Sequence, residues 1–300
     1  MATNDFLVFG GGAGANVITQ VTYSGLTART AGFSSGIAQS AQLNKVWRQS
    51  SIMSAVLAQL IADNTGQDAL DDGTTETLLA NLKDAVAGRL INVQIFTASG
   101  TYTPTPGTKS VIVEMVGGGA SGGATPATGA NQAAAAAGGG SGAYAKARFT
   151  SGFSGVSVTV GTGGAAPSAG SNGGNAGGTS SFGALVSCPG GNPGNFGFVL
   201  SGPGQPSSNG GNSAAPSGAN IFGMAGQSGA NGVVVASGFP LAGSGGSSPL
   251  GIGGHYPTGS GARSGSGYGS GSSGVNAPAS TAAQPGVAAQ PGVVIVYEFA

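Results

Sequence analysis

The sequence of 300 residues is poor in charged side chains and contains a single cysteine. Charged residues make up 6% of the chain, with nine of each sign, so the formal net charge is zero. This balance argues against nucleic acid and anionic membranes as partners, because both attract clustered basic side chains. Cys188 stands alone and cannot form a disulfide within the chain. Because a surface with so little charge favours self-association, we expect an obligate oligomer.

The sequence also lacks segments that would target the protein for secretion or insert it into a membrane. No basic stretch leads into an apolar run near the N-terminus, as a secretory signal would require. No window approaches the roughly 18 consecutive apolar residues of a membrane-spanning helix. We therefore expect synthesis and folding in a cytoplasm, without insertion into a membrane.

Residue types that carry catalysis or bind metals are scarce. A tetrahedral metal site needs four Cys, His or acidic ligands, whereas this chain has one cysteine and one histidine, His255. A ring of His255 side chains around an oligomer axis is an alternative to a solvated histidine. The last 200 residues contain two acidic residues, Glu114 and Glu298, each in or beside a predicted strand. Glycosidases need paired carboxylates in a groove, so we expect no enzymatic activity, no cofactor and no metal.

Two glycine motifs match catalytic signatures without the context those signatures need. Gly10, Gly12 and Ala15 fit the dinucleotide-binding pattern G-x-G-x-x-A, but no acidic residue follows until Asp63. Residues 32–36 fit the G-x-S-x-G pattern of a nucleophile elbow, but the lone histidine lies in another region. We interpret both as chance matches in a chain with 62 glycines.

Composition divides the chain near residue 91. Seven of the nine acidic residues precede residue 90, whereas 51 of the 62 glycines lie in the last 200 residues. We therefore predict an α+β fold, with a helical region over 1–91 and an all-β glycine-rich domain over 92–300. The expected form of the second domain is a β-sandwich with long loops.

The first region predicts two main helices. The longer one is expected between Ser40, as its N-cap, and Gly66, and the second runs from Thr74 or Thr75 to Val86. Apolar residues at alternating spacings of three and four form a seam on the longer helix. The seam residues are Leu43, Val46, Met53, Leu57 and Leu60. The seam is buried either within a two-helix hairpin or against copies of itself around an oligomer axis.

Alternating apolar residues predict strands in the second region. They lie at residues 93–97, 111–116, 144–148, 156–160, 233–235 and 293–299. Glycine-rich stretches such as 117–142 and 161–181 separate these strands, and we interpret them as long functional loops. The alternative is a set of polyglycine-type helices packed side by side, because glycine allows backbones to approach so closely.

Surface recognition is the function that this composition favours. Binding loops use tyrosine for contact area and Ser, Gly and Asn for adaptable hydrogen bonds. Residues 255–268 combine these types with an isolated cation and the single imidazole. The candidate receptor-binding residues are therefore His255, Tyr256, Arg263 and Tyr268, with Asn192, Asn195 and Phe196 as a second group. The alternative is a solvated loop without a ligand.

Several segments of the sequence resemble bacteriophage tail fibre proteins. Residues 4–7, 11–17, 38–49 and 67–73 resemble the N-terminal region of tail fibres from phages and prophages of Gram-negative bacteria. Residues 96–102, 111–119 and 292–298 resemble the glycine-rich domain at the tip of many tail proteins. The two resemblances together cover nearly the whole chain.

The resemblance implies a homotrimeric fibre in the phage virion. Its N-terminal region would be mounted on a baseplate or tail-tip protein. Its glycine-rich tip, often a β-sandwich with variable loops, would bind lipopolysaccharide, a pilus or an outer-membrane protein. The family shares no catalytic residues, and no long repetitive shaft separates the two regions here, which implies a short fibre. The competing hypotheses are a polysaccharide-degrading tailspike and a purely structural tail component.

Overall fold

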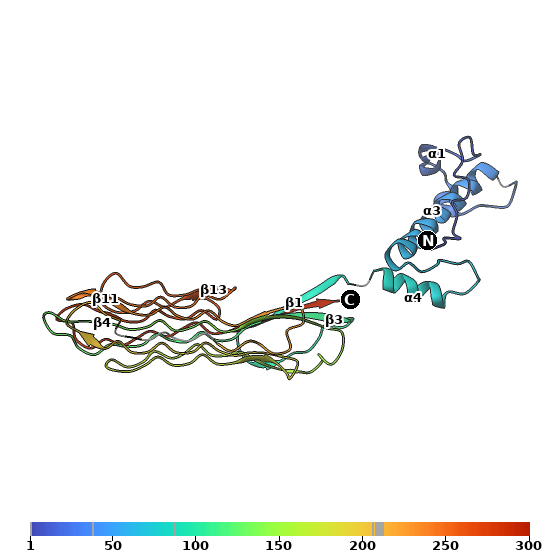
Figure 1. The fold of residues 1–300 in the computed structure, drawn as a ribbon. Coiled ribbons are helices and arrows are strands. Elements are labelled where there is room, and N and C mark those ends of the chain that lie inside the picture. The colour runs from blue at the N-terminus through green and yellow to red at the C-terminus, as the bar shows by residue number, and fades with distance from the viewer. Residues whose placement is uncertain (1, 38, 87, 206, 208–212) are drawn as a thin grey trace. The chain divides into compact units, whose positions relative to one another are not determined.

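The chain folds into two compact units, Met1–Arg89 and Leu90–Ala300 (Figure 1). The computed structural model describes residues 2–37, 39–86, 88–205, 207 and 213–300. Helices lie in the first unit and strands in the second, so the prediction of a helical region followed by a β region is confirmed. No helix within these described ranges is long and apolar enough to cross a membrane.

The described part of the first unit contains two short and two longer helices. They are α1 (Gln20–Ser24), α2 (Ala28–Ala31), α3 (Ser40–Thr65) and α4 (Glu76–Ala85). Helix α3 ends at Gly66 as predicted, because Gly66 adopts a left-handed conformation and its N–H donates to the Ala62 carbonyl. The expected N-cap was wrong by one residue: Gln39 precedes α3, and the Ser40 hydroxyl accepts a hydrogen bond from the Asn16 amide instead.

Helices α3 and α4 pack against each other, but not through the predicted seam. Their small core is made of buried residues with partly buried neighbours, namely Ala58, Ile61, Ala69, Ala85, Phe6, Leu78 and Leu82. In the seam, Met53, Leu57 and Leu60 stay exposed to 60%, 43% and 37%, and Leu43 and Val46 are half-buried. The hairpin therefore forms on an adjacent face of α3 and leaves three of the five seam residues exposed.

The second unit is built from antiparallel strands. The described strands are β1 (Leu90–Phe96), β2 (Gly100–Thr101), β3 (Ser110–Val116), β4 (Ala133–Ala135), β5 (Tyr144–Phe149), β6 (Ser157–Thr159), β7 (Ser180–Phe182), β8 (Val186–Cys188), β9 (Val199–Leu200), β10 (Phe222–Met224), β11 (Val233–Ala236), β12 (Phe239–Leu241), β13 (Gly251–Ile252), β14 (Ser266–Gly267), β15 (Asn276–Ala277) and β16 (Val293–Phe299). Each of the six strand segments predicted from alternation is present among them.

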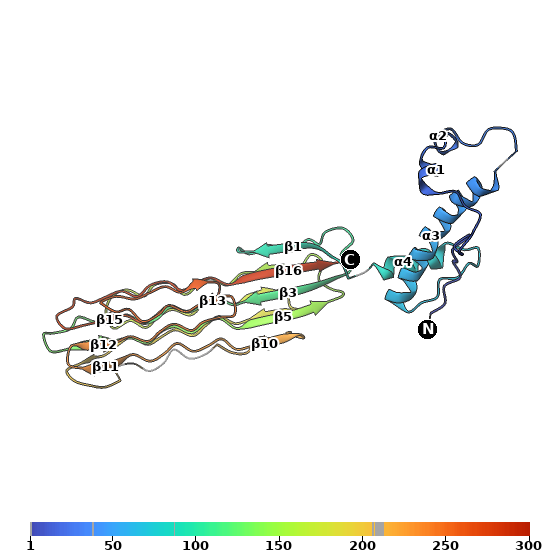
Figure 2. The same cartoon turned by 90° about the horizontal axis from the view of Figure 1, so that it is seen from above.

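Two sheets enclose the main core at one end of this unit, which we call the base. One sheet has the order β1-β16-β3-β5-β10, which can be followed in Figure 2, and the other has the order β2-β6-β7-β8. The core between them takes buried side chains from both sheets, including Val113, Met115, Phe182, Val186 and Val296. Three smaller sheets, β15-β4-β9, β11-β12 and β13-β14, lie further from the base.

The glycine-rich stretches are not loops, so that interpretation of the sequence was wrong. They continue the base strands as extended passes that run side by side along the unit (Figure 2). Residues 116–125, 133–145 and 270–277 are buried throughout, and they form the interior of the unit. Solvent-exposed turns occur where the passes reverse direction.

Hydrogen bonds within the buried passes repeat every three residues. The backbone N–H groups of residues 117, 120 and 123 donate to the carbonyls of residues 143, 140 and 137 on one neighbouring pass. The N–H groups of residues 118, 121 and 124 donate to the carbonyls of 178, 175 and 172 on a second pass. Those of residues 119 and 125 donate to the carbonyls of 290 and 284 on a third. A single pass thus donates in turn to three neighbouring passes. This is the behaviour of a helix with three residues per turn, as in polyproline II geometry. The alternative of polyglycine-type helices packed side by side is the one the structure adopts.

The close packing of the passes explains why they contain so much glycine. A Cβ atom on Gly139 would overlap the carbonyl oxygen of Ala120, and one on Gly271 would overlap that of Gly139. Buried serines complete the network: the Ser272 hydroxyl accepts from the N–H of Gly122 at 2.9 Å. Unpaired buried backbone groups would cost free energy, so these hydrogen bonds hold the passes in register.

Candidate binding surface

The end of the second unit opposite the base carries β4, β11, β12 and β15, and we call it the distal end (Figure 2). Turns at residues 126–132, 236–238 and 278–283 contact one another there, and a fourth turn, 201–205, lies beside β11 through the Gly204–Val234 bridge. Their sequences contain no charged residue and consist mainly of Gly, Ala, Ser, Thr, Asn, Gln and Pro. Residues of these types expose hydrogen-bonding groups without attracting ions.

Hydrogen bonds between the distal turns hold them in fixed positions. The Thr128 hydroxyl donates to the Pro278 carbonyl at 2.5 Å and accepts from the N–H of Thr281 at 3.0 Å. The Ser237 hydroxyl donates to the Asn131 carbonyl at 2.7 Å. Residues from three turns are therefore tied together, although they are up to 153 positions apart in the sequence. A surface held in this way loses little conformational entropy when it binds.

An exposed apolar patch accompanies these turns on the β11–β12 hairpin. Val233 lies opposite Leu241 across the hairpin, while Val234 and Pro240 are buried beneath. The exposed side chains are Val233 at 39%, Val235 at 51%, Phe239 at 68% and Leu241 at 45%. We call these four residues the distal patch. The sequence did not single them out, because an apolar run flanked by glycine is equally typical of a buried strand.

His255 and Tyr256 are exposed near the distal end. The side-chain amide of Asn276 donates to the carbonyl of Gly259 at 3.1 Å, and Asn276 itself pairs with Ala135 of β4. The turn that follows Tyr256 is thereby fixed beside the small sheet β15-β4-β9. Tyr256 is 52% exposed, which leaves its ring accessible to a partner.

Arg263 lies beside the residue before His255, because a Cβ atom on Gly254 would overlap the Arg263 carbonyl oxygen, whereas Tyr268 is placed differently. Arg263 is exposed, and its backbone is held by Ser273 through two hydrogen bonds of 2.8 and 2.9 Å. Tyr268 is half-buried against Val116 and Val293 of the base strands. Its N–H donates to the carbonyl of Leu250, six residues before Tyr256 and on the order of 19 Å away at a rise of ~3.1 Å per residue. The structure therefore separates Tyr268 from His255 and Tyr256.

The second group of predicted residues lies on the side of the lattice, the name we give to the set of packed polyglycine passes. Asn192 and Asn195 are exposed, and their carbonyls accept hydrogen bonds from Gly140 and Ala137 of a buried pass. The Phe196 ring is half-buried and lies 4.5 Å from the Phe198 ring, centroid to centroid. These residues belong to a pass rather than to a distal turn.

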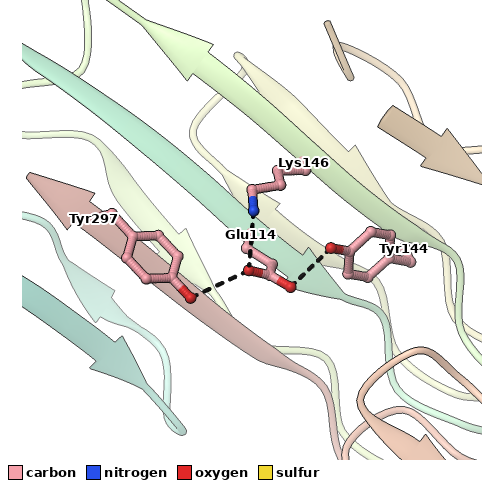
Figure 3. Close-up of polar contacts among 4 residues, drawn as sticks. All are labelled: Glu114, Tyr144, Lys146 and Tyr297. Carbon is pink, nitrogen blue, oxygen red and sulfur yellow. Dashed lines mark hydrogen bonds and ion pairs between the residues drawn. The ribbon is translucent and has the colours of Figure 1, made fainter. Parts of the chain in front are cut away.

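Glu114 is the centre of a polar cluster on the outer face of the five-stranded sheet (Figure 3). The hydroxyls of Tyr144 and Tyr297 donate to its carboxylate at 2.8 and 3.2 Å, and the Lys146 ammonium lies 3.8 Å away. Burial, together with the hydrogen bonds to this carboxylate, raises the pKa of both tyrosines. The carboxylate is thus fully engaged by its neighbours.

Glu298 is buried in a second cluster, on the opposite face of the same sheet. It accepts hydrogen bonds from the Tyr102 hydroxyl at 2.6 Å, the Thr105 hydroxyl at 2.6 Å and the Gln94 amide at 3.0 Å. Burial acts to raise the pKa of Glu298, but the hydrogen bonds from Thr105 and Tyr102 outweigh it and hold the pKa below its ordinary value.

These two carboxylates do not form a catalytic pair. Glu114 lies opposite Ile295 in the β3–β16 register, so Glu298, three positions further, faces the other side of the sheet. Among the described residues, no group of three His, Cys, Asp or Glu side chains is arranged to hold a metal ion. Burial raises the pKa of the Cys188 thiol to about 12, which keeps it protonated near neutral pH.

Comparison with known protein families identifies the second unit. Residues 96–297 match the model of a glycine-rich domain family. No curated protein matches the chain. The matched range begins at the last residue of β1 and ends within β16, so it takes in the base core and all the polyglycine passes.

Proposed function

The chain belongs to the glycine-rich domain family, and from this premise we propose that it is a phage tail fibre subunit that binds a host receptor through its distal end. Its helical unit mounts on a baseplate or tail-tip protein and joins three copies into a trimer. The receptor is lipopolysaccharide, a pilus or an outer-membrane protein of a Gram-negative bacterium. The phage assignment itself rests on the resemblance of the sequence to tail fibres.

The observation that carries the proposal is the apolar surface held rigid at the distal end. Phe239 and Tyr256 supply large exposed rings, and Thr128 and Ser237 tie the surrounding turns together. Rigid aromatic groups beside small polar residues are typical of recognition surfaces, because they offer contact area at low entropic cost. The buried passes support this surface without contributing to it.

The absence of charged residues from the distal turns indicates which chemical class of receptor they can bind. Phosphate groups are recognised mainly through arginine, lysine or helix N-termini, and the four turns contain no basic residue. This favours recognition of neutral sugars or of protein loops through stacking and hydrogen bonds. The separation of Glu114 from Glu298 favours binding over glycoside cleavage.

The uncovered part of the α3 seam supports oligomerisation. Met53, Leu57 and Leu60 repeat at spacings of four and three and are exposed in the single chain. Side chains at such spacing bury one another when helices supercoil. The proposed trimer would remove these residues from water.

The test is whether the purified full-length chain binds bacteria. Its mass would be measured by light scattering, and the same preparation would be added to a panel of Gram-negative strains before phage challenge. A trimer that binds a strain and blocks adsorption supports the proposal. A folded trimer that binds no strain contradicts it and favours a structural tail component.

A further inference from the structure

The charged side chains of the first unit are sorted along helix α3. Between residues 6 and 62 the chain has no acidic residue and three basic ones, Arg29, Lys45 and Arg48, whereas residues 63–84 contain six acidic residues and one basic residue. Helices α1 and α2 lie beside the N-terminal half of α3, and α4 lies beside its C-terminal half (Figure 2). The 26 residues of α3 span ~39 Å at ~1.5 Å each, so the unit has a basic end and an acidic end.

Hydrogen bonds within the chain engage the acidic end. The Asp68 carboxylate accepts from the N–H of Thr3 at 2.6 Å, and the Asp72 carboxylate accepts from the N–H and the hydroxyl of Thr74, both at 2.8 Å. The hydrogen bonds from Thr3 and Thr74 hold the pKa of these two carboxyls below its ordinary value. Charges at this end are therefore stabilised without a partner.

Lys45 and Arg48 at the basic end are not stabilised in this way. They lie three positions apart on α3, where side chains are neighbours. In the part of the chain that the structure describes, neither side chain forms an ion pair with a carboxylate. Lys45 is 6% exposed, and its ammonium lies 6.0 Å from the centre of the Tyr23 ring, which attracts a cation but does not neutralise it. Like charges at this spacing repel each other and an unpaired buried charge is costly, so an anion bound at both residues would stabilise them.

Two accessible aromatic rings border Arg48 on the side away from Lys45. Successive residues of a helix are turned by ~100°, so Arg48 lies between Lys45 and Trp47 around α3. Trp47 is 52% exposed and its ring packs edge-on against the ring of Phe9, which is 48% exposed, with 5.7 Å between the centroids. We call Phe9, Lys45, Trp47 and Arg48 the basic site.

The chemistry of the basic site selects one class of partner. Two cations are too few for nucleic acid, whose affinity comes from the neutralisation of many phosphates. A small anion such as phosphate would pair with the cations but leave both rings in water. A protein segment with acidic side chains beside an apolar one engages the cations and the rings together, through charge-assisted hydrogen bonds and apolar contact.

We propose that the basic site binds an acidic segment of another protein, with carboxylates on Lys45 and Arg48 and an apolar side chain against Trp47. The inference rests on the proposed mounting of the helical unit on a baseplate or tail-tip protein and deepens it, because it names the surface and the chemistry of that mount. It requires neither the trimer nor receptor binding by the distal end.

Trp47 is the single tryptophan of the chain, so its fluorescence reports on the basic site without a label. The full-length chain would be titrated with a blocked hexapeptide, Asp-Leu-Asp-Glu-Leu-Glu, and with a neutral peptide that carries Asn and Gln in place of the acids. We expect the acidic peptide to change the Trp47 emission and to bind about tenfold or more tightly than the neutral one, because hydrogen bonds to charged groups are the stronger ones. Its affinity should fall as salt is added, because salt screens the charges.

A matched pair of variants tests the residues themselves. Lys45→Met with Arg48→Gln removes both charges while keeping an unbranched side chain at each position, and it should lose the preference for the acidic peptide. Arg29→Gln with Lys83→Gln removes two charges outside the basic site and should bind like the wild type. Circular dichroism would show whether both variants fold. If the first variant does not fold, the comparison of the two peptides on the wild type still decides.

Four results would overturn the inference. In the first, the wild-type chain binds both peptides equally, and in the second, the folded Lys45→Met, Arg48→Gln variant keeps its preference. In the third, inorganic phosphate alone reproduces the change in Trp47 emission, which makes the site one for small anions. In the fourth, the mass by light scattering falls when the acidic peptide is added, because a second copy of the chain then occupies the site. Each leaves receptor binding to the separate assay on bacteria.

Discussion

Gly119 lies so close to Ser270 that a Cβ atom on Gly119 would overlap the Ser270 carbonyl oxygen. The two residues are on neighbouring buried passes, and the N–H of Gly119 donates to the carbonyl of Gln290 on a third pass. The polyglycine lattice therefore depends on glycine at particular positions, and its backbone cannot move aside without breaking several hydrogen bonds. The stability of the second unit therefore depends on the absence of a side chain at Gly119.

Replacing Gly119 by alanine should destabilise the second unit severely. The added methyl group meets the backbone of Ser270 and Gly271, so we expect a loss of about 3 kcal/mol or more in the free energy of unfolding, at the upper end of overpacking effects. Chemical denaturation followed by circular dichroism would measure it. Gly202→Ala is the matched control, because nothing lies within 4 Å of a Cβ there, and its stability should change by under about 1 kcal/mol. Equal effects of the two substitutions would contradict the lattice.

The buried carboxylate of Glu298 should make stability depend on acidic pH. Its pKa is held below the ordinary value in the folded chain, so its contribution is fully present above the unfolded pKa and is lost as pH falls through the folded pKa. Glu298→Gln removes this charge from Tyr102 and Thr105, and we expect a cost of about 1.5–3 kcal/mol near neutral pH. The difference between wild type and variant should shrink below about pH 4. A difference that is constant from pH 7 to pH 3 would disprove this role.

Substitutions in the α3 seam should dissociate the oligomer. Lysines at positions 57 and 60 place charges where helices would meet, so light scattering of Leu57→Lys with Leu60→Lys should show monomers. Ser54→Lys, on an exposed position of the same helix, should keep the wild-type mass. An unchanged mass for the double variant would show that another surface joins the copies.

The sequence was sufficient to locate the two longer helices and the longer strands. The α3 terminus could be predicted because Gly66 provides a local left-handed cap, and strands such as β3 and β16 show their own alternation. Local signals of this kind need no knowledge of distant residues. The Ser40 cap failed because Asn16, a residue 24 positions away, takes the serine hydroxyl.

The packing of the polyglycine passes could not be predicted from the sequence as the longer helices and strands could. Its hydrogen bonds join backbone groups far apart, such as Gly119 and Gln290, and backbone partners impose no side-chain pattern. Alanine and serine are also tolerated where Cβ has room, as at Ala120 and Ser121, and they obscure the three-residue period. Polarity and glycine content alone therefore predicted loops where the structure has a buried interior.

The exposure of the candidate residues was predicted in part. Tyr256 stands out as an exposed aromatic residue near the distal end, whereas Tyr268 was included because of its place in the same Gly-Ser segment and packs on the base strands. Phe239 was overlooked because a single sequence does not reveal which side of a hairpin is covered. Its exposure depends on Pro240 taking the buried side.

Recognition by the distal end is the central claim, and binding of a distal-end variant to bacteria tests it most directly. Phe239→Ser with Tyr256→Ser should weaken binding of the purified chain to a susceptible strain by about 2 kcal/mol or more, on the order of thirtyfold, as expected for aromatic hot spots. Ile252→Ser, at a position 72% exposed on the flank, should bind like the wild type. A double variant that keeps its mass and fold and still binds at wild-type affinity would contradict the account.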